Sequence, residues 1–156
     1  MLCLVWVGWA WAHGDISELP NAVQIMQYRL LLYMNPDDPA PRNRLAMALY
    51  RTNQLEEAEK ELRHILERDS QNFDALDGLG IVLIKMGRYQ EALQYLRKAV
   101  RINDQDVMVY VHLSVVYQKM KLPEMAQKEL DKARSLMSAP VELEKIEKEF
   151  ELVSGP

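Results

Sequence analysis

A regular internal repeat constrains this chain more than any other feature of its sequence. Between residues 39 and 140 one arrangement of large and small residues occurs three times. In each copy a leucine directly precedes a small residue, at the equally spaced pairs Leu45-Ala46, Leu79-Gly80 and Leu113-Ser114. A period of about 34 residues is typical of folds in which each copy packs on its neighbours. The sequence therefore predicts a stack of similar units.

Each copy contains two apolar stripes of helical spacing. Within residues 73–106, Leu79 and Leu83 belong to the first stripe, and Ala92 and Leu96 begin the second. Apolar residues three and four apart lie on one face of an α-helix. A short polar segment separates the two stripes, so each copy is predicted to be a helical hairpin.

Turn and capping residues fall in the same phase. Asp38, Asn72 and Asp106 each precede a new hairpin, where a short acceptor side chain caps free backbone N–H groups. Asn53 and Gly87 lie at the turn inside the hairpin, where a left-handed residue is favoured. The third copy has a lysine at that position, which is a departure from the pattern.

We therefore expect an all-α fold, an α-solenoid of stacked helix-turn-helix hairpins. The register predicts a linker and one half-repeat helix in residues 13–38, and repeats in residues 39–72, 73–106 and 107–140. Residues 141–153 should form a last amphipathic helix. Such a helix covers the apolar face that a stack leaves open at its end. The alternative is a helix offered to a partner.

Residues 1–12 are apolar, carry no charged side chain and contain all three tryptophans. As a helix they would reach about 18 Å, too short for a bilayer core of about 30 Å. The ending Ala10-Trp11-Ala12 resembles a signal-peptide cleavage site, although no Lys or Arg precedes it. We expect an exported, periplasmic or membrane-associated protein. One alternative is that residues 1–12 form a buried docking strap in a cytoplasmic protein. Another is that the start site is wrongly assigned and a longer membrane segment lies upstream of it.

The charge excludes one class of partner. The formal net charge is −4, with both signs spread along the chain. Nucleic-acid-binding domains carry a basic patch or stripe, which this sequence lacks. We therefore expect no nucleic-acid partner.

The sequence offers little chemistry. Its three histidines are widely separated, and its single cysteine, Cys3, lies in the apolar segment. It has no glycine-rich phosphate loop and no haem attachment pair. Asp74 and Asp77 share one helix face, as acid–base pairs do, but two solvated carboxylates are the simpler interpretation. His112 falls near the first-helix face, where ordinary packing is the simpler interpretation. We expect no metal, no cofactor and no enzymatic activity.

The repeats resemble the tetratricopeptide repeat family. The resemblance is carried by Leu79-Gly80, Gly87, Tyr89, Ala92, Leu96 and Ala99, and by matching residues in the other two copies. It implies a right-handed superhelix whose concave groove is lined by the first helix of each repeat. It also implies binding of protein segments without catalysis. The groove positions that it implies are Asn43, Met47, Tyr50, Arg51, Asp77, Ile81, Ile84, Lys85, Met108, Val111, Val115, Gln118 and Lys119.

Two features of this implied groove bear on its ligand. Its apolar members suit an apolar helix or extended segment, unless they pack between neighbouring first helices. Arg51, Lys85 and Lys119 share one repeat position and suit an acidic segment or a terminal carboxylate. The alternative is that each cation complements the dipole at its helix end. One subclass of the family binds the terminal carboxylate of a chaperone with a clamp of lysines and asparagines. The corresponding positions here include Asp74, Gly78 and Met108, so this clamp is not present.

The predicted function is that of a protein-binding scaffold or adaptor. It would serve as an assembly factor or accessory subunit of an envelope or membrane-associated complex. One alternative is a self-associating structural subunit, in which residues 1–12 and the half repeat near Tyr28 form the oligomer contact. Two others are a spacer with an unused groove and an enzyme with an unrecognised site.

Overall fold

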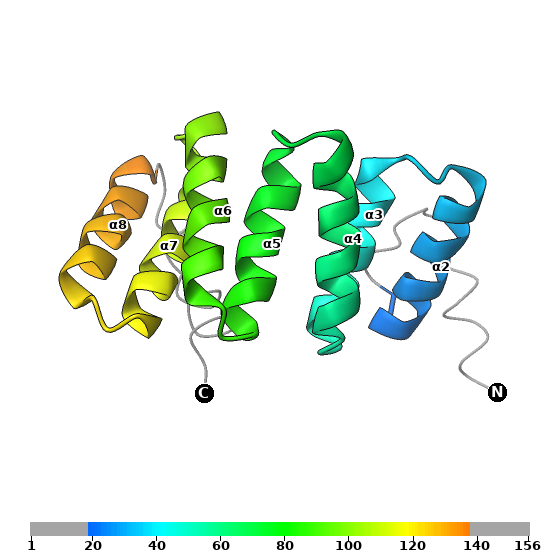
Figure 1. Ribbon diagram of the computed structural model, residues 1–156, viewed down its shortest axis with the longest axis horizontal. Coiled ribbons are helices and arrows are strands. Elements are labelled where there is room, and N and C mark those ends of the chain that lie inside the picture. Colours follow the sequence, from blue (N-terminus) through cyan, green and yellow to red (C-terminus); the bar gives the residue numbers. More distant parts are fainter. Residues whose placement is uncertain (1–18, 138–156) are drawn as a thin grey trace. The chain divides into compact units, whose positions relative to one another are not determined.

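The computed structural model describes residues 19–137, and this part of the chain contains helices and no strands (Figure 1). The predicted segments 1–12 and 141–153 lie outside the described residues. The helices are α2 (Asn21–Met34), α3 (Pro39–Arg51), α4 (Leu55–Arg68), α5 (Phe73–Lys85), α6 (Tyr89–Ile102), α7 (Val107–Lys119) and α8 (Pro123–Leu136). The chain forms two compact units, one ending at Glu61 and the other beginning at Leu62, so that the boundary falls inside α4.

The helix boundaries repeat with the period of the sequence. The first helices α3, α5 and α7 begin at equal intervals, at Pro39, Phe73 and Val107. The second helices α4, α6 and α8 keep the same interval. Helix α2 begins one such interval before α4, and so it stands in the register of a second helix.

Side-chain caps begin the first helices where the sequence predicted them. The Asn72 side chain accepts a hydrogen bond from the Ala75 backbone N–H at 3.1 Å. Asp106 accepts from the backbone N–H of Val109 at 3.1 Å. In unit 1, Asp38 accepts from the backbone N–H at the second position of α3, at 3.0 Å. Each bond satisfies a backbone donor that the helix itself leaves without a partner.

The turns inside the hairpins are left-handed. Asn53 has φ 61° and Gly87 has φ 76°, as predicted. Lys121 occupies the same place in the third hairpin and has φ 60°. A residue with a Cβ atom adopts this conformation at a cost of about 1–2 kcal/mol. Repeat geometry therefore overrides the local preference of the lysine.

Unit 1 has a core between α2 and α3. Ile25, Tyr28 and Leu32 supply the buried face of α2, and Leu45 and Leu49 are buried in α3. Burying a side chain of this size contributes about 1.5–3 kcal/mol. The packing of these two faces holds the half-repeat helix α2 against α3.

Unit 2 contains the second half of α4 and two packed hairpins, α5–α6 and α7–α8. Leu79, Leu83 and Leu96 are fully buried. A Cβ atom added to Gly80 would lie 2.5 Å from Cδ2 and 2.6 Å from Cγ of Leu96. Only a glycine allows α5 and α6 to approach this closely, which is the physical reason for the leucine–small pair in the second repeat.

Candidate protein-binding site

In unit 1 the implied groove residues lie on α3. Asn43, Met47 and Tyr50 are half-buried, and Arg51 is exposed at the end of the helix. The Asn43 Oδ1 atom is buried and has no hydrogen-bond partner within the described part of the chain. These side chains therefore present a mixed apolar and polar surface.

Arg51 has a structural role that the sequence did not reveal. Its Nε donates to Asn21 Oδ1 at 3.0 Å, and its Nη2 donates to Gln24 Oε1 at 2.8 Å. Gln24 is buried and also donates to the carbonyl of Leu19. Arg51 thus ties the end of α3 to the start of α2. This role differs from that of a ligand-binding cation at a groove edge.

In unit 2 four of the five apolar residues of the implied groove are buried. Ile81 and Ile84 of α5 are 7% and 3% exposed, and Val111 and Val115 of α7 have no exposed surface. This agrees with the alternative that such residues pack inside the protein. That these four residues contact a partner stays a prediction. Their burial gives it no support.

The remaining implied residues of unit 2 are at least partly accessible. Lys85 and Gln118 are exposed, and Met108 and Lys119 are half-buried. Lys85 and Lys119 lie in the last turns of α5 and α7, where a cation also complements the helix dipole. The accessible surface of these two first helices is therefore polar and cationic near their ends.

A buried polar contact links α5 and α7. His112 Nδ1 lies 2.7 Å from Asp77 Oδ1, and the two side chains are only 3% and 16% exposed. Asp74 lies on the same helix as Asp77 and is exposed. Sequence reasoning considered Asp77 and His112 separately and did not connect them. The signal was available, because both are polar residues on otherwise apolar first helices of neighbouring repeats.

Charged residues on the second helices form their own cluster. Arg63 donates to the Tyr95 hydroxyl at 2.9 Å, and Arg88 donates to Glu91 at 2.7 and 2.8 Å. The hydrogen bond from Arg88 holds the pKa of the Glu91 carboxyl below its ordinary value, and Arg63 adds to this effect. The cluster joins the end of α4 to α6. It is explained by the packing of unit 2.

The described residues contain neither a metal centre nor a membrane span. No group of three or more His, Cys, Asp or Glu side chains within residues 19–137 is placed to hold a metal ion. None of the described helices combines the length and apolar character needed to cross a membrane.

Sequence comparison identifies the family. Two models of the tetratricopeptide repeat match residues 43–107 and 83–137, which together cover more than half of the chain. The chain belongs to the tetratricopeptide repeat family, and its fold is an all-α solenoid of helical hairpins. No curated protein matches the chain.

Solved structures of repeat proteins share this fold. TTC0263, a thermophilic tetratricopeptide repeat protein of Thermus thermophilus, is 20% identical with a TM-score of 0.73, covering 86% of this chain and 75% of that one. One MamA structure is 19% identical with a TM-score of 0.68, covering 92% and 80%. Another is 21% identical with a TM-score of 0.66, and the chain spans 64% of its length. Identities this low establish the fold alone.

Proposed function

We propose that this protein is a non-catalytic scaffold that binds an acidic segment of a partner protein at the first helices of its repeats. The family fold supports a protein-binding role, because stacked repeats create an extended surface to which each repeat contributes equivalent helix positions. One observation carries the choice of ligand. In unit 2 four of the five apolar positions are buried, whereas Lys85 and Gln118 are exposed and Lys119 is half-buried. Charge-assisted contacts to carboxylates are the strong interactions that such a surface offers.

Of the two kinds of ligand that the sequence left open, this proposal keeps the acidic segment and not the apolar one. An apolar segment would need Ile81, Ile84, Val111 and Val115 at the surface, and all four are buried. The accessible surface of α5 and α7 therefore favours carboxylates over an apolar segment.

A charge reversal tests the proposal. We expect Lys85→Glu with Lys119→Glu to reduce capture of partner proteins from an extract of the source cells at least tenfold. The reason is that each hydrogen bond to a charged group contributes about 1.5–3 kcal/mol. Quantitative mass spectrometry of proteins retained on the tagged full chain is the measurement, with circular dichroism as the check on folding.

Two exposed lysines on second helices give a matched control. Lys60→Glu with Lys128→Glu makes the same change of net charge away from the first helices. This variant should retain its partners. Equal losses in both double variants would show that net charge, and not this site, controls binding. Unchanged capture by the first variant would contradict the proposal directly.

We further propose that the protein works in an envelope or membrane-associated complex, as an assembly factor or accessory subunit. The support is the composition of residues 1–12, which are apolar and end in a small-x-small pattern. The mass of the chain recovered from its own cells tests this location. A chain that begins at His13 supports export, whereas an intact chain in the soluble cytoplasmic fraction contradicts it.

A further inference from the structure

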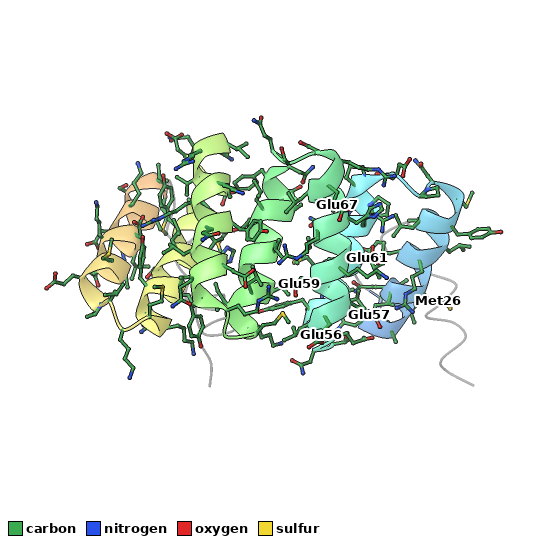
Figure 2. All side chains as sticks on the ribbon, in the orientation of Figure 1. Met26, Glu56, Glu57, Glu59, Glu61 and Glu67 are labelled. Carbon is green, nitrogen blue, oxygen red and sulfur yellow. The ribbon has the colours of Figure 1, made fainter. Side chains whose placement is uncertain are left out.

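The outer face of α2 carries an exposed apolar stripe. Met26, Leu30, Tyr33 and Met34 are 65%, 57%, 85% and 75% exposed, and Leu31 beside them is 41% exposed. Figure 2 shows Met26 projecting from this helix. The opposite face of α2 is the one that packs on α3. The stripe is therefore additional to the core of unit 1.

The other second helices show that the fold does not require apolar residues at three of the five stripe positions. Because the second helices begin at equal intervals, each α2 position has a counterpart in α4, α6 and α8. The counterparts of Met26, Leu30 and Tyr33 are polar or charged in all three helices, and all except His64 are exposed. They are Lys60, His64 and Glu67 in α4, Gln94, Lys98 and Arg101 in α6, and Lys128, Lys132 and Ser135 in α8.

The stripe is a large apolar surface for a monomer. Four of its members, Met26, Leu30, Tyr33 and Met34, are each more than half exposed. Soluble monomers rarely expose contiguous apolar patches larger than a few hundred Å², and larger exposed patches mark interaction sites. Contact with the same stripe of a second copy would remove both from water.

We propose that this stripe binds the same stripe of a second copy of the chain, in an antiparallel α2–α2 contact. Met26, Leu30 and Met34 lie at every fourth position on one row of the helix, with a methionine at each end and a leucine at the centre. A two-fold axis at Leu30 would place Met26 of one copy against Met34 of the other. Rows of this spacing interdigitate in the commonest class of helix packing. Self-complementary faces of this kind form closed dimers.

The charges near the stripe favour a second copy over a lipid surface. Arg29 is the single charged residue of α2, and it lies next to the central Leu30. Its guanidinium forms an ion pair with Glu57 of the same chain at 2.7 Å. The two-fold contact therefore does not bring two uncompensated cations together. A membrane-surface helix, in contrast, usually carries several cations around its apolar face, and α2 has no second one.

The contact differs from the self-association expected from sequence. It uses the outer face of α2 and does not require residues 1–12. It is also independent of the proposed binding of an acidic segment, because it shares no residue with that site. Failure of one proposal would leave the other intact.

Sedimentation velocity of the full chain over about 1–100 µM tests the dimer. We expect the natural chain to dimerise and the variant Met26→Lys/Leu30→Lys/Tyr33→Ser to be monomeric, with dimerisation at least 100-fold weaker. The variant gives α2 the three residues that α8 carries at the same positions, so its helix should form. Gln90→Lys with Gln94→Lys is the control, because it adds the same charge to the exposed face of α6.

Cross-linking at the proposed axis gives a second readout. In a Cys3→Ser background, Leu30→Cys should form a covalent dimer with a short bismaleimide, whereas Lys98→Cys should not. A natural chain that stays monomeric throughout would overturn the proposal, as would a triple variant that still dimerises. A monomer that floats with phosphatidylcholine–phosphatidylglycerol vesicles only when the stripe is present would assign the stripe to a membrane, and would also overturn it.

Discussion

Ile84→Glu is expected to lower the free energy of unfolding by about 3–5 kcal/mol, because it places a carboxylate at a buried apolar position without a partner. Ile84 is 3% exposed in α5. Domains of this size are stable by only about 5–15 kcal/mol, so the loss should be visible in both thermal and urea unfolding. Chemical denaturation followed by circular dichroism is the measurement.

Ile102→Glu is the matched control for this prediction. Ile102 ends α6 in the same unit and is 43% exposed. The same chemical change there should cost less than about 0.5 kcal/mol, as substitutions on the surface usually do. A small effect at both positions would mean that Ile84 is accessible after all, as a groove residue would be. Ile84→Glu is consequently unsuitable as a binding test, since lost capture would follow from lost folding.

Leu79→Ala should lower the free energy of unfolding by about 2–5 kcal/mol, the usual cost of a large-to-small change in a core. Leu79 has no exposed surface and lies directly before the glycine that contacts Leu96. Leu76 and Leu83, at helical spacing before and after it, are also buried, so the change would leave a cavity inside the core. The midpoint of thermal unfolding should fall by several degrees.

A leucine outside the core provides the comparison. Leu122 precedes α8 and is 41% exposed, so Leu122→Ala should change stability by only a few tenths of a kcal/mol. If Leu79→Ala were as mild as this control, Leu79 would not be a core position and the repeat register would be incorrect.

The repeat architecture was accessible to sequence reasoning because its signals are local. Helix caps such as Asn72 and Asp106 act on backbone groups in the first turn of the helix that follows. The left-handed turn at Gly87 is equally local, since it depends on the φ of one residue. Because such signals recur at the same positions of successive copies, they indicate a stack of helical hairpins. The third copy lacks the favoured turn residue and has Lys121 in its place, yet this residue adopts the same left-handed conformation.

The site was less predictable because it depends on burial between helices. A repeat position places a residue on a first helix, but it does not say whether a neighbouring helix covers it. Ile84 and Val115 fall at groove positions of the family and are buried here. Contacts between residues distant in sequence were also missed. His112 pairs with Asp77 across two repeats, and Arg51 bonds to α2 through Gln24.

The stripe on α2 shows a related limit of periodicity. The helix has apolar residues on two faces, and helical spacing alone assigns all of them to a core. Only burial separates Ile25 and Leu32, which pack on α3, from Met26 and Leu30, which face outward.

Site-specific photo-cross-linking in the source cells tests the central claim, that partners bind at the first helices. A benzophenone amino acid would replace Gln118 of α7 in one variant and Gln94 of α6 in another, because both glutamines are exposed and only the first lies on a first helix. We expect a covalent adduct with a partner protein from position 118 and none from position 94. Adducts of equal yield from both positions, or an adduct from position 94 alone, would contradict the claim.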